Sequence, residues 1–384
     1  MVNNKHCSEE MYKHFRSGKM IEPLNLDGNE NVKDFITNVF GNSGFNARRL
    51  FEACKIFDKM IENDATICLT LSGAMTPIGM SGPIIKLIEK GFIDFIISTG
   101  ANLYHDLHRP FGYPMKQGDF KVDDSMLEQC GIARIYDVYI EDSETLLATD
   151  KVILDTVRKR DFTKFISTSD LHYFLGKEVA KSAPHPEKSL LVAAYNHNVP
   201  VYTSSPGDSS IAMNLILPHF YDEPISIDPL MDILETAALV WKSDKNGAIE
   251  IGGGSPKNFY MQTQPTLWQI LGLNKGGHDF FIQLTTDSPQ WGGLSGATPQ
   301  EAISWGKLKE ETRDYAVVYS DASITFPLLA QYANMTHGPR KHKELFKIKD
   351  SLAKELLDEA KQQPALQERF KSIFKYKPGE SGVL

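Results

Sequence analysis

Short apolar runs that alternate with helical patterns make up most of the chain. Six runs are rich in β-branched and aromatic residues and are bounded by Gly, Ser, Asp or Pro, namely 65–71, 92–98, 190–204, 247–254, 279–286 and 315–323. Because they are nearly continuous in apolar residues, they predict strands that are buried on both faces. We therefore expect an α/β fold with a mostly parallel sheet and helices on both faces.

Helical patterns lie between these runs and at both ends of the chain. Apolar residues three and four positions apart predict helices in 31–40 and 47–64. Asp228-Pro229 offers an N-cap and a first helical residue for a helix over 229–243. The charged tail, roughly 340–374, has an amphipathic helical pattern, which Pro364 should break.

The chain has no internal repeat, low-complexity tract or obvious linker. Its 384 residues are long enough for one large α/β domain or two ordinary ones. We expect one structural domain, with a helical extension at 1–64, the main α/β region at 65–335 and a helical tail at 336–384.

Composition narrows the class of protein. A hydrophobic content of 41% and a charged content of 23% are typical of globular chains. No apolar run approaches the roughly twenty residues of a membrane span, and the first residues lack the apolar core of a signal peptide. The net charge of −8 argues against a nucleic-acid partner and is compatible with a cationic substrate, although many cytoplasmic proteins are equally acidic.

The four cysteines are scattered at Cys7, Cys54, Cys68 and Cys130, with no Cys-x-x-Cys pair. This spacing argues against a disulfide scaffold and against a structural zinc site. It fits a reducing compartment, so we expect a cytoplasmic protein.

The segments that follow the predicted strands are rich in small and polar residues. They are 72–77, 98–106, 204–210, 251–258, 285–296 and 320–323. In open parallel sheets, ligands bind beyond the carboxyl ends of the strands. Glycines let the backbone approach a ligand closely, and free N–H groups at helix starts suit phosphates. Six such segments indicate a ligand of dinucleotide size, although the Gly-x-Gly-x-x-Gly fingerprint is absent.

Glu301, Trp305 and Lys307 form the most unusual cluster of side chains. A lysine attacks carbonyl or imine carbon only when neutral, and desolvation beside an aromatic ring lowers its pKa. Trp305 could hold a cation over its ring, and Glu301 could bind an ammonium group or move protons. On pattern alone, however, a surface lysine at a helix start beside a buried tryptophan is the favoured interpretation.

His105, Asp106 and His108 allow a metal site, since histidine and carboxylate are ordinary ligands. Nothing near them completes a recognisable ligand set, so a cofactor contact or a structural cluster is favoured and no metal is predicted.

Other strand-end residues have two interpretations each. Gly252–Gly254 is either a phosphate-side loop or a tight turn, and Asp208 and Asp321 are either ribose contacts or helix N-caps. Trp291, next to Gly292-Gly293, lines a pocket or caps the core. The serines lack a Gly-x-Ser-x-Gly elbow, which argues against a serine hydrolase.

Two segments resemble the deoxyhypusine synthase family specifically. They are "SGATPQEAISWGKL" at 295–308 and "VVYSDASITFPLL" at 317–329, and the resemblance extends over about 65–335. The stretch "STGANLYHDLH" at 98–108 looks like the bacterial deoxyhypusine synthase-like branch. The resemblance implies a Rossmann-like NAD-binding catalytic domain, and a homotetramer of dimers with active sites at the subunit interface.

The resemblance also implies a reaction. Spermidine is oxidised with NAD to an imine and cleaved, which releases 1,3-diaminopropane. The aminobutyl group is held on an enzyme lysine as a Schiff base, and an acceptor amine then displaces the lysine before the retained NADH reduces the product. By resemblance Lys307 is this lysine, Trp305 lines the polyamine channel and Glu301 holds a substrate ammonium.

Cofactor contacts carry over at matching positions. By resemblance, the residues expected to contact NAD are Thr76, Thr99, Gly100, Ala101, His105, Asp208, Gly253, Gly254, Thr286, Asp287, Asp321 and Ala322. Those expected to contact the substrate are Tyr104, Asn258, Gly292, Gly293, Leu294 and Ser295.

The sequence departs from protein-modifying members of the family at the amine contacts. Tyr104-His105 replaces two adjacent glutamates, Asn258 replaces a histidine, and Leu294 and Met213 replace aspartates. A site with fewer carboxylates should take a different or less charged substrate. We expect a homospermidine synthase-like enzyme that moves an aminobutyl group to a small amine. The alternatives are deoxyhypusine synthesis on a translation-factor lysine and an inactive NAD-binding relative.

Overall fold

A six-stranded parallel sheet forms the centre of the protein in a computed structural model that describes residues 8–26, 28–159 and 165–374. The sheet order is β6-β2-β1-β7-β8-β9. The strands are β1 (Thr66–Leu71), β2 (Phe95–Ser98), β6 (Val201–Thr203), β7 (Asn246–Ile251), β8 (Phe280–Thr285) and β9 (Tyr315–Tyr319). The chain therefore builds outward from β1, returns to the middle at β7 and builds outward on the other side, which puts a topological switch point between β1 and β7.

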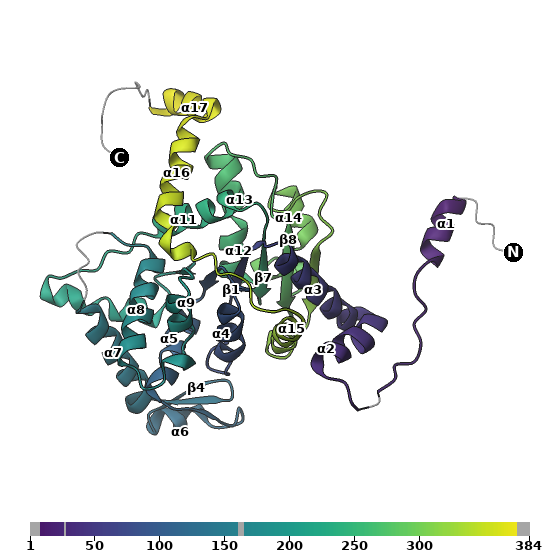
Figure 1. Cartoon of the computed structure of the whole chain (residues 1–384). Coiled ribbons are helices and arrows are strands. Elements are labelled where there is room, and N and C mark those ends of the chain that lie inside the picture. Colours follow the sequence, from purple (N-terminus) through teal and green to yellow (C-terminus); the bar gives the residue numbers. More distant parts are fainter. Residues whose placement is uncertain (1–7, 27, 160–164, 375–384) are drawn as a thin grey trace.

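Helices cover both faces of this sheet, so the predicted α/β architecture is confirmed (Figure 1). Those packed on one face include α3 (Phe45–Glu62), α4 (Ser81–Glu89), α5 (Gly100–Asp106), α8 (Thr168–Ser182), α9 (Leu190–Asn196) and α15 (Ala322–Thr336). Those on the other face include α11 (Pro229–Lys242), α12 (Gly254–Met261) and α16 (Lys349–Lys361). As the sequence predicted, Asp228 caps α11 by accepting a hydrogen bond from Leu230 N at 2.9 Å.

The remaining helices are short. They are α1 (Glu9–Arg16), α2 (Val32–Asp34), α6 (Asp124–Gln129), α7 (Ala148–Val157), α10 (Ser210–Asn214), α13 (Thr263–Pro265), α14 (Pro299–Ser304) and α17 (Pro364–Phe374). Single turns of 3-10 helix occupy Phe40–Asn42, Arg109–Phe111, Pro186–Lys188, Leu217–Tyr221, Pro289–Trp291, Leu294–Gly296 and Leu345–Lys347. The π-helical turns are Phe35–Val39, Asp142–Leu147 and Thr266–Ile270.

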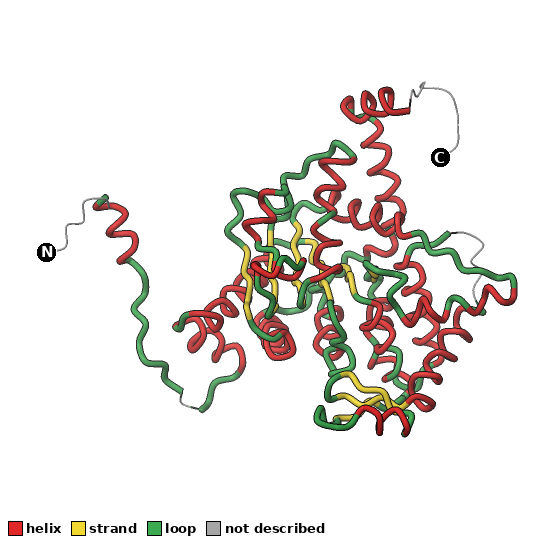
Figure 2. The backbone as a smooth tube through the Cα atoms, turned by 180° about the vertical axis from the view of Figure 1, so that it is seen from behind, coloured by secondary structure: helices red, strands yellow, loops and turns green. Residues whose placement is uncertain are grey.

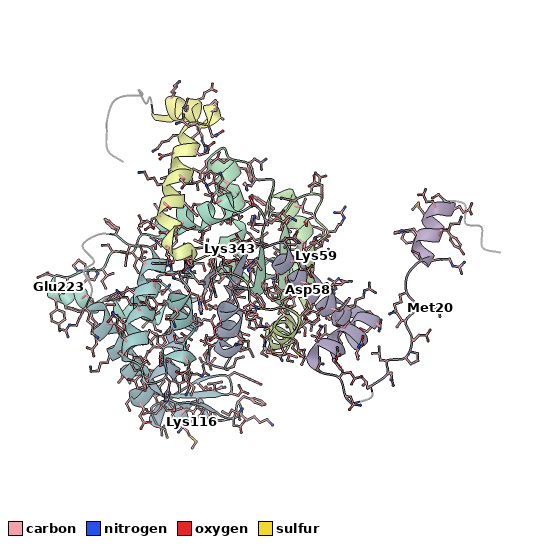
Figure 3. The ribbon with its side chains drawn as sticks, in the orientation of Figure 1. Met20, Asp58, Lys59, Lys116, Glu223 and Lys343 are labelled. Atoms are coloured by element: carbon pink, nitrogen blue, oxygen red, sulfur yellow. The ribbon has the colours of Figure 1, made fainter. Side chains whose placement is uncertain are left out.

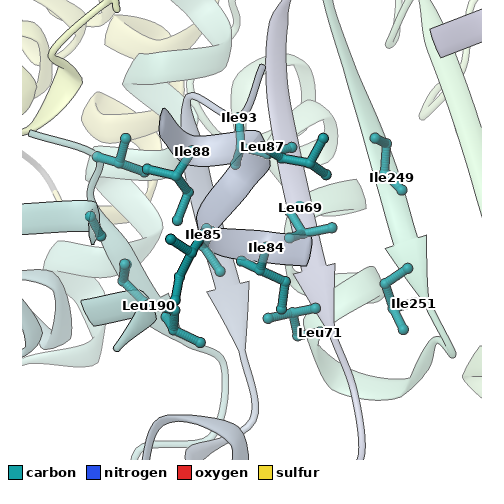
Figure 4. Packing of buried hydrophobic residues seen from close by; sticks show 14 of the residues in the cluster. Leu69, Leu71, Ile84, Ile85, Leu87, Ile88, Ile93, Leu190, Ile249 and Ile251 are labelled. Carbon is teal, nitrogen blue, oxygen red and sulfur yellow. The ribbon is translucent and has the colours of Figure 1, made fainter. Parts of the chain in front are cut away.

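Branched aliphatic side chains fill the core on one face of the sheet. In Figure 4, Leu69 and Leu71 of β1 and Ile249 and Ile251 of β7 lie on the face that meets Ile84 of α4. All of these side chains are buried. Burial of such a side chain contributes about 1.5–3 kcal/mol to folding, so this core fixes the strand ends that carry the site.

The prediction that the run at 190–204 is a strand throughout is wrong. Its first half is helix α9, and only Val201–Thr203 is strand β6. The side chain of Ser189 caps α9, and the Asp106 carboxylate accepts hydrogen bonds from Leu190 N at 2.9 Å and Leu191 N at 3.2 Å. A short buried apolar run does not distinguish helix from strand by periodicity, and here the polar cap decides.

A small antiparallel sheet was not predicted at all. It has the order β3-β5-β4, with β3 (Met115–Gln117), β4 (Ile132–Ile135) and β5 (Val138–Glu141). These strands are short and mostly only half-buried, so they lack the continuous apolar pattern of the main sheet.

The N-terminal segment is less helical than predicted. Helix α1 stands away from the body, and the described residues between it and α2, 17–26 and 28–30, contain no helix (Figure 2). Met20 on this stretch is 78% exposed, and it lies far from Lys116 of the small sheet (Figure 3). Residues 1–7, including Cys7, lie outside the described residues. Helix α3, by contrast, buries Leu50, Ala53 and Phe57 in the main core.

The tail begins without helix and becomes helical near residue 345. Helix α16 begins at Lys349, and Pro364 begins the separate helix α17, so the predicted break is confirmed. Residues 375–384 lie outside the described part of the chain. The division at 64 and 335 stays a prediction. Within the described ranges, every helix is too short or too polar to cross a bilayer.

Candidate functional site

Loops from five strands meet at the carboxyl edge of the sheet. The Ser72 hydroxyl, after β1, donates to Gly253 O, after β7. Thr99, after β2, donates through its hydroxyl to Gly73 O at 2.7 Å. The hydroxyls of Ser205 and Ser255 lie 3.2 Å apart and join the loop after β6 to α12. The loop after β8 joins through Ser295, whose Oγ accepts from Gly254 N at 2.8 Å. Five of the six predicted strand-end loops are therefore joined into one continuous surface.

The three glycines at 252–254 are required for two separate structural reasons. Gly252 and Gly254 have φ of 75° and 55°, in the left-handed region that favours glycine. Gly253 is extended, but a Cβ there would lie 2.5 Å from Ser295 Cα. The glycines therefore turn the chain from β7 into α12 and let the turn at 294–296 pack directly on it.

Lys307 lies at the end of the motif that begins with this turn. Helix α14 starts at Pro299 with Thr298 as N-cap, and Gly306, with φ of 65°, ends the turn that follows it. Lys307 Nζ donates to Asn258 Oδ1 at 3.1 Å and lies 5.7 Å from the centre of the Trp305 ring. Burial, reinforced by the positive charge of Lys257, lowers the pKa of Lys307. Both effects shift the amine toward its neutral, nucleophilic form.

Trp305 is 60% exposed, so it is not the buried tryptophan of the alternative interpretation. Its ring is available to a second cation as well as to Lys307. Glu301, in the first turn of α14, is exposed, and its charge raises the pKa of Lys307. Glu301 therefore influences the charge of the amine at Lys307.

A buried polar row under α12 was missed by the sequence analysis. Thr70, Glu250 and Gln283 are register partners on β1, β7 and β8, and all three side chains are buried. Lys257 of α12, only 5% exposed, donates through Nζ to Gln283 Oε1 at 2.9 Å and to Ala297 O at 2.7 Å. A lone glutamate inside the apolar run "GAIEI" was the available signal.

A cavity of about 280 Å³ opens beside Asn258. Its lining combines hydroxyl, amide and apolar side chains, from Ile233, Thr236, Ser255, Asn258, Phe259, Gln262, Thr263, Thr266 and Leu294. None of these lining side chains is charged. Two predicted substrate contacts, Asn258 and Leu294, are therefore found together, and through Asn258 the cavity adjoins Lys307.

The first predicted cofactor positions pack against protein. Thr76 is fully buried, and its hydroxyl donates to Asn102 O at 2.7 Å, which leaves no surface for a ligand. Gly100 is buried because Ser209 occupies the place of a Cβ. Thr99 and Ala101 are partly exposed at the start of α5.

Tyr104 is a further correction, because the structure places it in the core rather than in a substrate channel. It is 4% exposed, and its hydroxyl donates to Asp150 Oδ1 at 2.9 Å and to Leu146 O at 3.1 Å. His105 Nδ1 lies 2.9 Å from His108 Nε2, and burial lowers the pKa of His105 to about 4 and that of His108 to about 3. Both rings are therefore neutral at pH 7.

The metal interpretation of these histidines finds no geometric basis. The carboxylate of Asp106 points to the start of α9, where Ser189 Oγ donates to it at 2.6 Å. No cluster of three or more His, Cys, Asp or Glu side chains suited to a metal occurs in the described part of the chain.

The other predicted contacts are spread along the same edge. Asp208, Thr286, Gly292 and Gly293 are exposed, and Asp287 is partly exposed. Asp321 follows the edge strand β9, two strands from β7, and caps α15 by accepting from Ser323 N at 2.7 Å, with Ala322 as the first helical residue. Asp321 thus has the N-cap role that the sequence left open.

Two glycines after strands near the switch point face open space. A methyl group on Gly73 or on Gly207 would meet no atom within 4 Å, so the backbone after β1 and β6 faces open space. The exposed Asp208 and the start of α12 border the same loops. These residues fit the predicted NAD site, with Gly73 as an addition that the sequence analysis missed.

Comparison with known proteins gives a consistent result. A family model described as deoxyhypusine synthase matches residues 35–333. A deoxyhypusine synthase-like protein of Nostoc punctiforme is 42% identical over 362 residues, which cover 91% of this chain and 92% of that one. Probable deoxyhypusine synthase 2 of Methanosarcina acetivorans is 39% identical over 290 residues, covering 75% of this chain and 82% of that one.

A solved structure agrees at the level of the fold. The putative deoxyhypusine synthase from Entamoeba histolytica has a TM-score of 0.54 and 16% identity, covering 84% of this chain and 99% of that one. The extent of the sequence matches and this shared fold lead to one assignment: the chain belongs to the deoxyhypusine synthase family, a family of aminobutyl transferases.

Proposed function

We propose that the protein is an NAD-dependent transferase that moves an aminobutyl group from a polyamine to a small amine through a Schiff base on Lys307. The observation that carries this proposal is the environment of Lys307. Its amine is half-buried, donates to a neutral amide oxygen and lies over a partly exposed tryptophan. Such a lysine, in a chain of an aminobutyl-transfer family, is suited to attack an imine carbon.

Each residue of the motif has a separate task. The neutral amine of Lys307 forms a bond to the imine carbon of the oxidised donor, and 1,3-diaminopropane leaves with the proton it needs. The acceptor amine then attacks the same carbon and Lys307 departs as a free amine. Trp305 and Glu301 hold the ammonium groups of donor and acceptor while these exchanges take place.

The strand-end loops would hold NAD, through Thr99, Asp208, Gly253, Gly254, Thr286 and Asp287. When bound there, NAD supplies the oxidant for the donor amine and the reductant for the product imine. The chain's part is to fix the cofactor beside Lys307, since the triple glycine links β7 to the turn at 294–296.

The cavity beside Lys307 supports a small acceptor. Its lining offers hydroxyls and amides, with no carboxylate to hold a second ammonium. Burial of an unpaired ammonium costs several kcal/mol, so a chain with few charges fits this cavity best. Glu301, which is outside this lining, is the carboxylate of the motif for the second ammonium of putrescine. A guanidinium carries the same charge but is more weakly hydrated and can donate to several hydroxyl and amide oxygens.

A panel of amines tests the proposal. We expect spermidine with NAD and putrescine to yield homospermidine without any protein acceptor, separated and identified by mass. Agmatine in place of putrescine tests whether the neutral cavity prefers a guanidinium. Labelling of a translation factor, with failure of every free amine, would instead establish deoxyhypusine synthesis. Binding of NAD without any product would establish an inactive relative.

We also propose a cytoplasmic homotetramer in which two chains complete each active site. The exposed positions of Trp291, Leu294 and Trp305, at 69%, 50% and 60%, leave an apolar rim that a second subunit would cover. Light scattering should show a tetramer, and a fully active monomer would contradict this part of the proposal.

A further inference from the structure

Two lysines and one buried carboxylate share the space under α12. Lys257 is almost completely buried, Lys307 is half-buried, and Glu250 is fully buried on β7. Neither carboxylate oxygen of Glu250 has a hydrogen-bond partner within the described structure. A buried carboxylate without hydrogen bonds is costly, so a function or a nearby positive charge must account for it.

The sheet register places Glu250 next to Lys257. Glu250 pairs with Gln283 across β7 and β8, so their side chains leave the same face of the sheet. Lys257 Nζ donates to Gln283 Oε1 at 2.9 Å, which brings the ammonium to that face. Burial raises the pKa of Glu250 and lowers that of Lys257, while each group shifts the other back toward its charged form.

Consecutive residues of α12 hold the Lys307 segment from two sides. Lys257 binds Ala297 O at 2.7 Å, in the turn that leads into α14, and Asn258 binds Lys307 Nζ at 3.1 Å. One carboxylate can compensate one buried ammonium. Lys257 is the more deeply buried lysine and has two fixed oxygen acceptors, which suit a group that only donates. Lys257 is therefore a better site for a proton than Lys307.

We propose that Glu250 and Lys257 form a buried charge pair, and that the positive charge of Lys257, held beside the Lys307 segment through Ala297, opposes protonation of Lys307. Lys257 is then a positioning residue that acts through Lys307 and touches no substrate. The inference rests on the proposed function only in taking Lys307 as the nucleophile. The other titratable groups whose charges reach either lysine are Asp287, His278 and Glu301.

The direction of the effect follows from the neighbours of Lys307. Burial makes the largest contribution to the lowered pKa of Lys307, and the charge of Lys257 makes the second largest. Both exceed the raising effects of Glu301 and Glu250. Removal of Lys257 should therefore raise the pKa of Lys307 whether or not Glu250 takes up a proton in response. The neutral fraction of Lys307 at pH 7 then falls.

The test measures Lys307 directly, without substrate or cofactor. Carbamoylation of the full-length protein by cyanate, followed from pH 6 to pH 10 by peptide mass mapping, gives the reactivity of each lysine. In Lys257→Met we expect the rate at Lys307 to fall about tenfold at pH 7, as a like charge at close range predicts, and to recover at pH 10. Lys257→Arg keeps the charge and should keep the wild-type profile.

Two further variants serve as controls. Lys257→Met leaves Glu250 unpaired, so the double variant Lys257→Met/Glu250→Gln removes both charges and should fold. Because Glu250 raises the pKa of Lys307, the double variant should show a loss at Lys307 of the same sign but smaller size. Lys309→Met removes a cation two residues from Lys307 that pairs with Asp279 at 2.5 Å, and it should leave the profile unchanged.

The outcomes separate the two proposals. An unchanged Lys307 profile in both Lys257→Met and the double variant would overturn the inference, as would the same loss in Lys309→Met. A shifted profile with no Schiff base from any amine would leave the charge pair standing and remove the proposed transferase. A Schiff base on Lys307 with an unchanged profile would support the proposed transferase and remove the charge pair.

Discussion

Replacing Gly253 by alanine tests how tightly the glycine loop and the Lys307 motif are joined. A Cβ at this position would lie 2.5 Å from Ser295 Cα and 2.7 Å from Ser295 Cβ, where ordinary contact begins at 3.4 Å. The φ of Gly253 is 170°, outside the left-handed region that favours glycine, so the contact with Ser295 is the main obstacle to a side chain there. Relief of this contact requires the two segments to separate by roughly 1 Å.

Two consequences should follow at once. Overpacking of this kind costs about 1–3 kcal/mol of unfolding free energy. The shift also loosens the bond from Gly254 N to Ser295 Oγ and moves the turn that leads to Lys307. A displacement of 1 Å at a reacting group reduces rates by up to about 100-fold. We therefore expect Gly253→Ala to fold with lower stability and to form the Lys307 Schiff base much more slowly.

The assay combines urea denaturation with borohydride trapping of Lys307. Gly82→Ala in α4 is the matched control, because a Cβ there meets no atom within 4 Å and alanine suits a helix. The control should retain both stability and trapping. Wild-type stability together with wild-type trapping in Gly253→Ala would refute the reasoning about this close approach.

Three further predictions concern the fold around the site. Burial lowers the pKa of His172 to about 4, below its unfolded value, so the contribution of His172 to stability is present above pH 6.5 and lost as the pH falls toward 4. The stability difference between wild type and His172→Gln, from urea curves, should shrink by about 1.4 kcal/mol per pH unit in that window. A pH-independent difference would contradict this. Lys349→Met should cost about 3–5 kcal/mol because it leaves Glu235 buried without its partner at 2.9 Å; Lys349→Met/Glu235→Gln should recover part of this, and equal losses would argue against the pair. Tyr104→Phe should lose about 1 kcal/mol through its bond to Asp150 yet keep the amine preference of the enzyme; a changed product spectrum would return Tyr104 to the substrate site.

The main sheet could be predicted because its strands are buried on both faces. In β1, β7 and β8 every residue is buried, so the apolar runs had nearly no interruption. The small sheet at 115–141 gave no such signal, because its strands are short and mostly half-exposed. The first half of 190–204 became helix through contacts of Asp106, which is distant in sequence. The N-cap Ser189 is a local signal for this helix, but the contacts of Asp106 are not visible in any local pattern.

The site residues could likewise be predicted only in part from the sequence. Pattern alone favoured a surface lysine at 307, and only the resemblance to a family selected it as the nucleophile. The lone charge of Glu250 in an apolar strand was readable but was passed over. Tyr104 matched an acidic position of the family, and its burial against Asp150 depends on a helix more than forty residues later. Such tertiary contacts decide which matching position still faces a ligand.

The central claim is that Lys307 carries the aminobutyl group, and one measurement tests it directly. The protein is incubated with NAD and spermidine, reduced with borohydride and digested, and the peptides are mapped by mass. We predict a single aminobutyl adduct, on Lys307, that is lost in Lys307→Arg, because an arginine stays protonated and forms no imine. An adduct on another lysine, or full turnover by Lys307→Arg, would contradict the account.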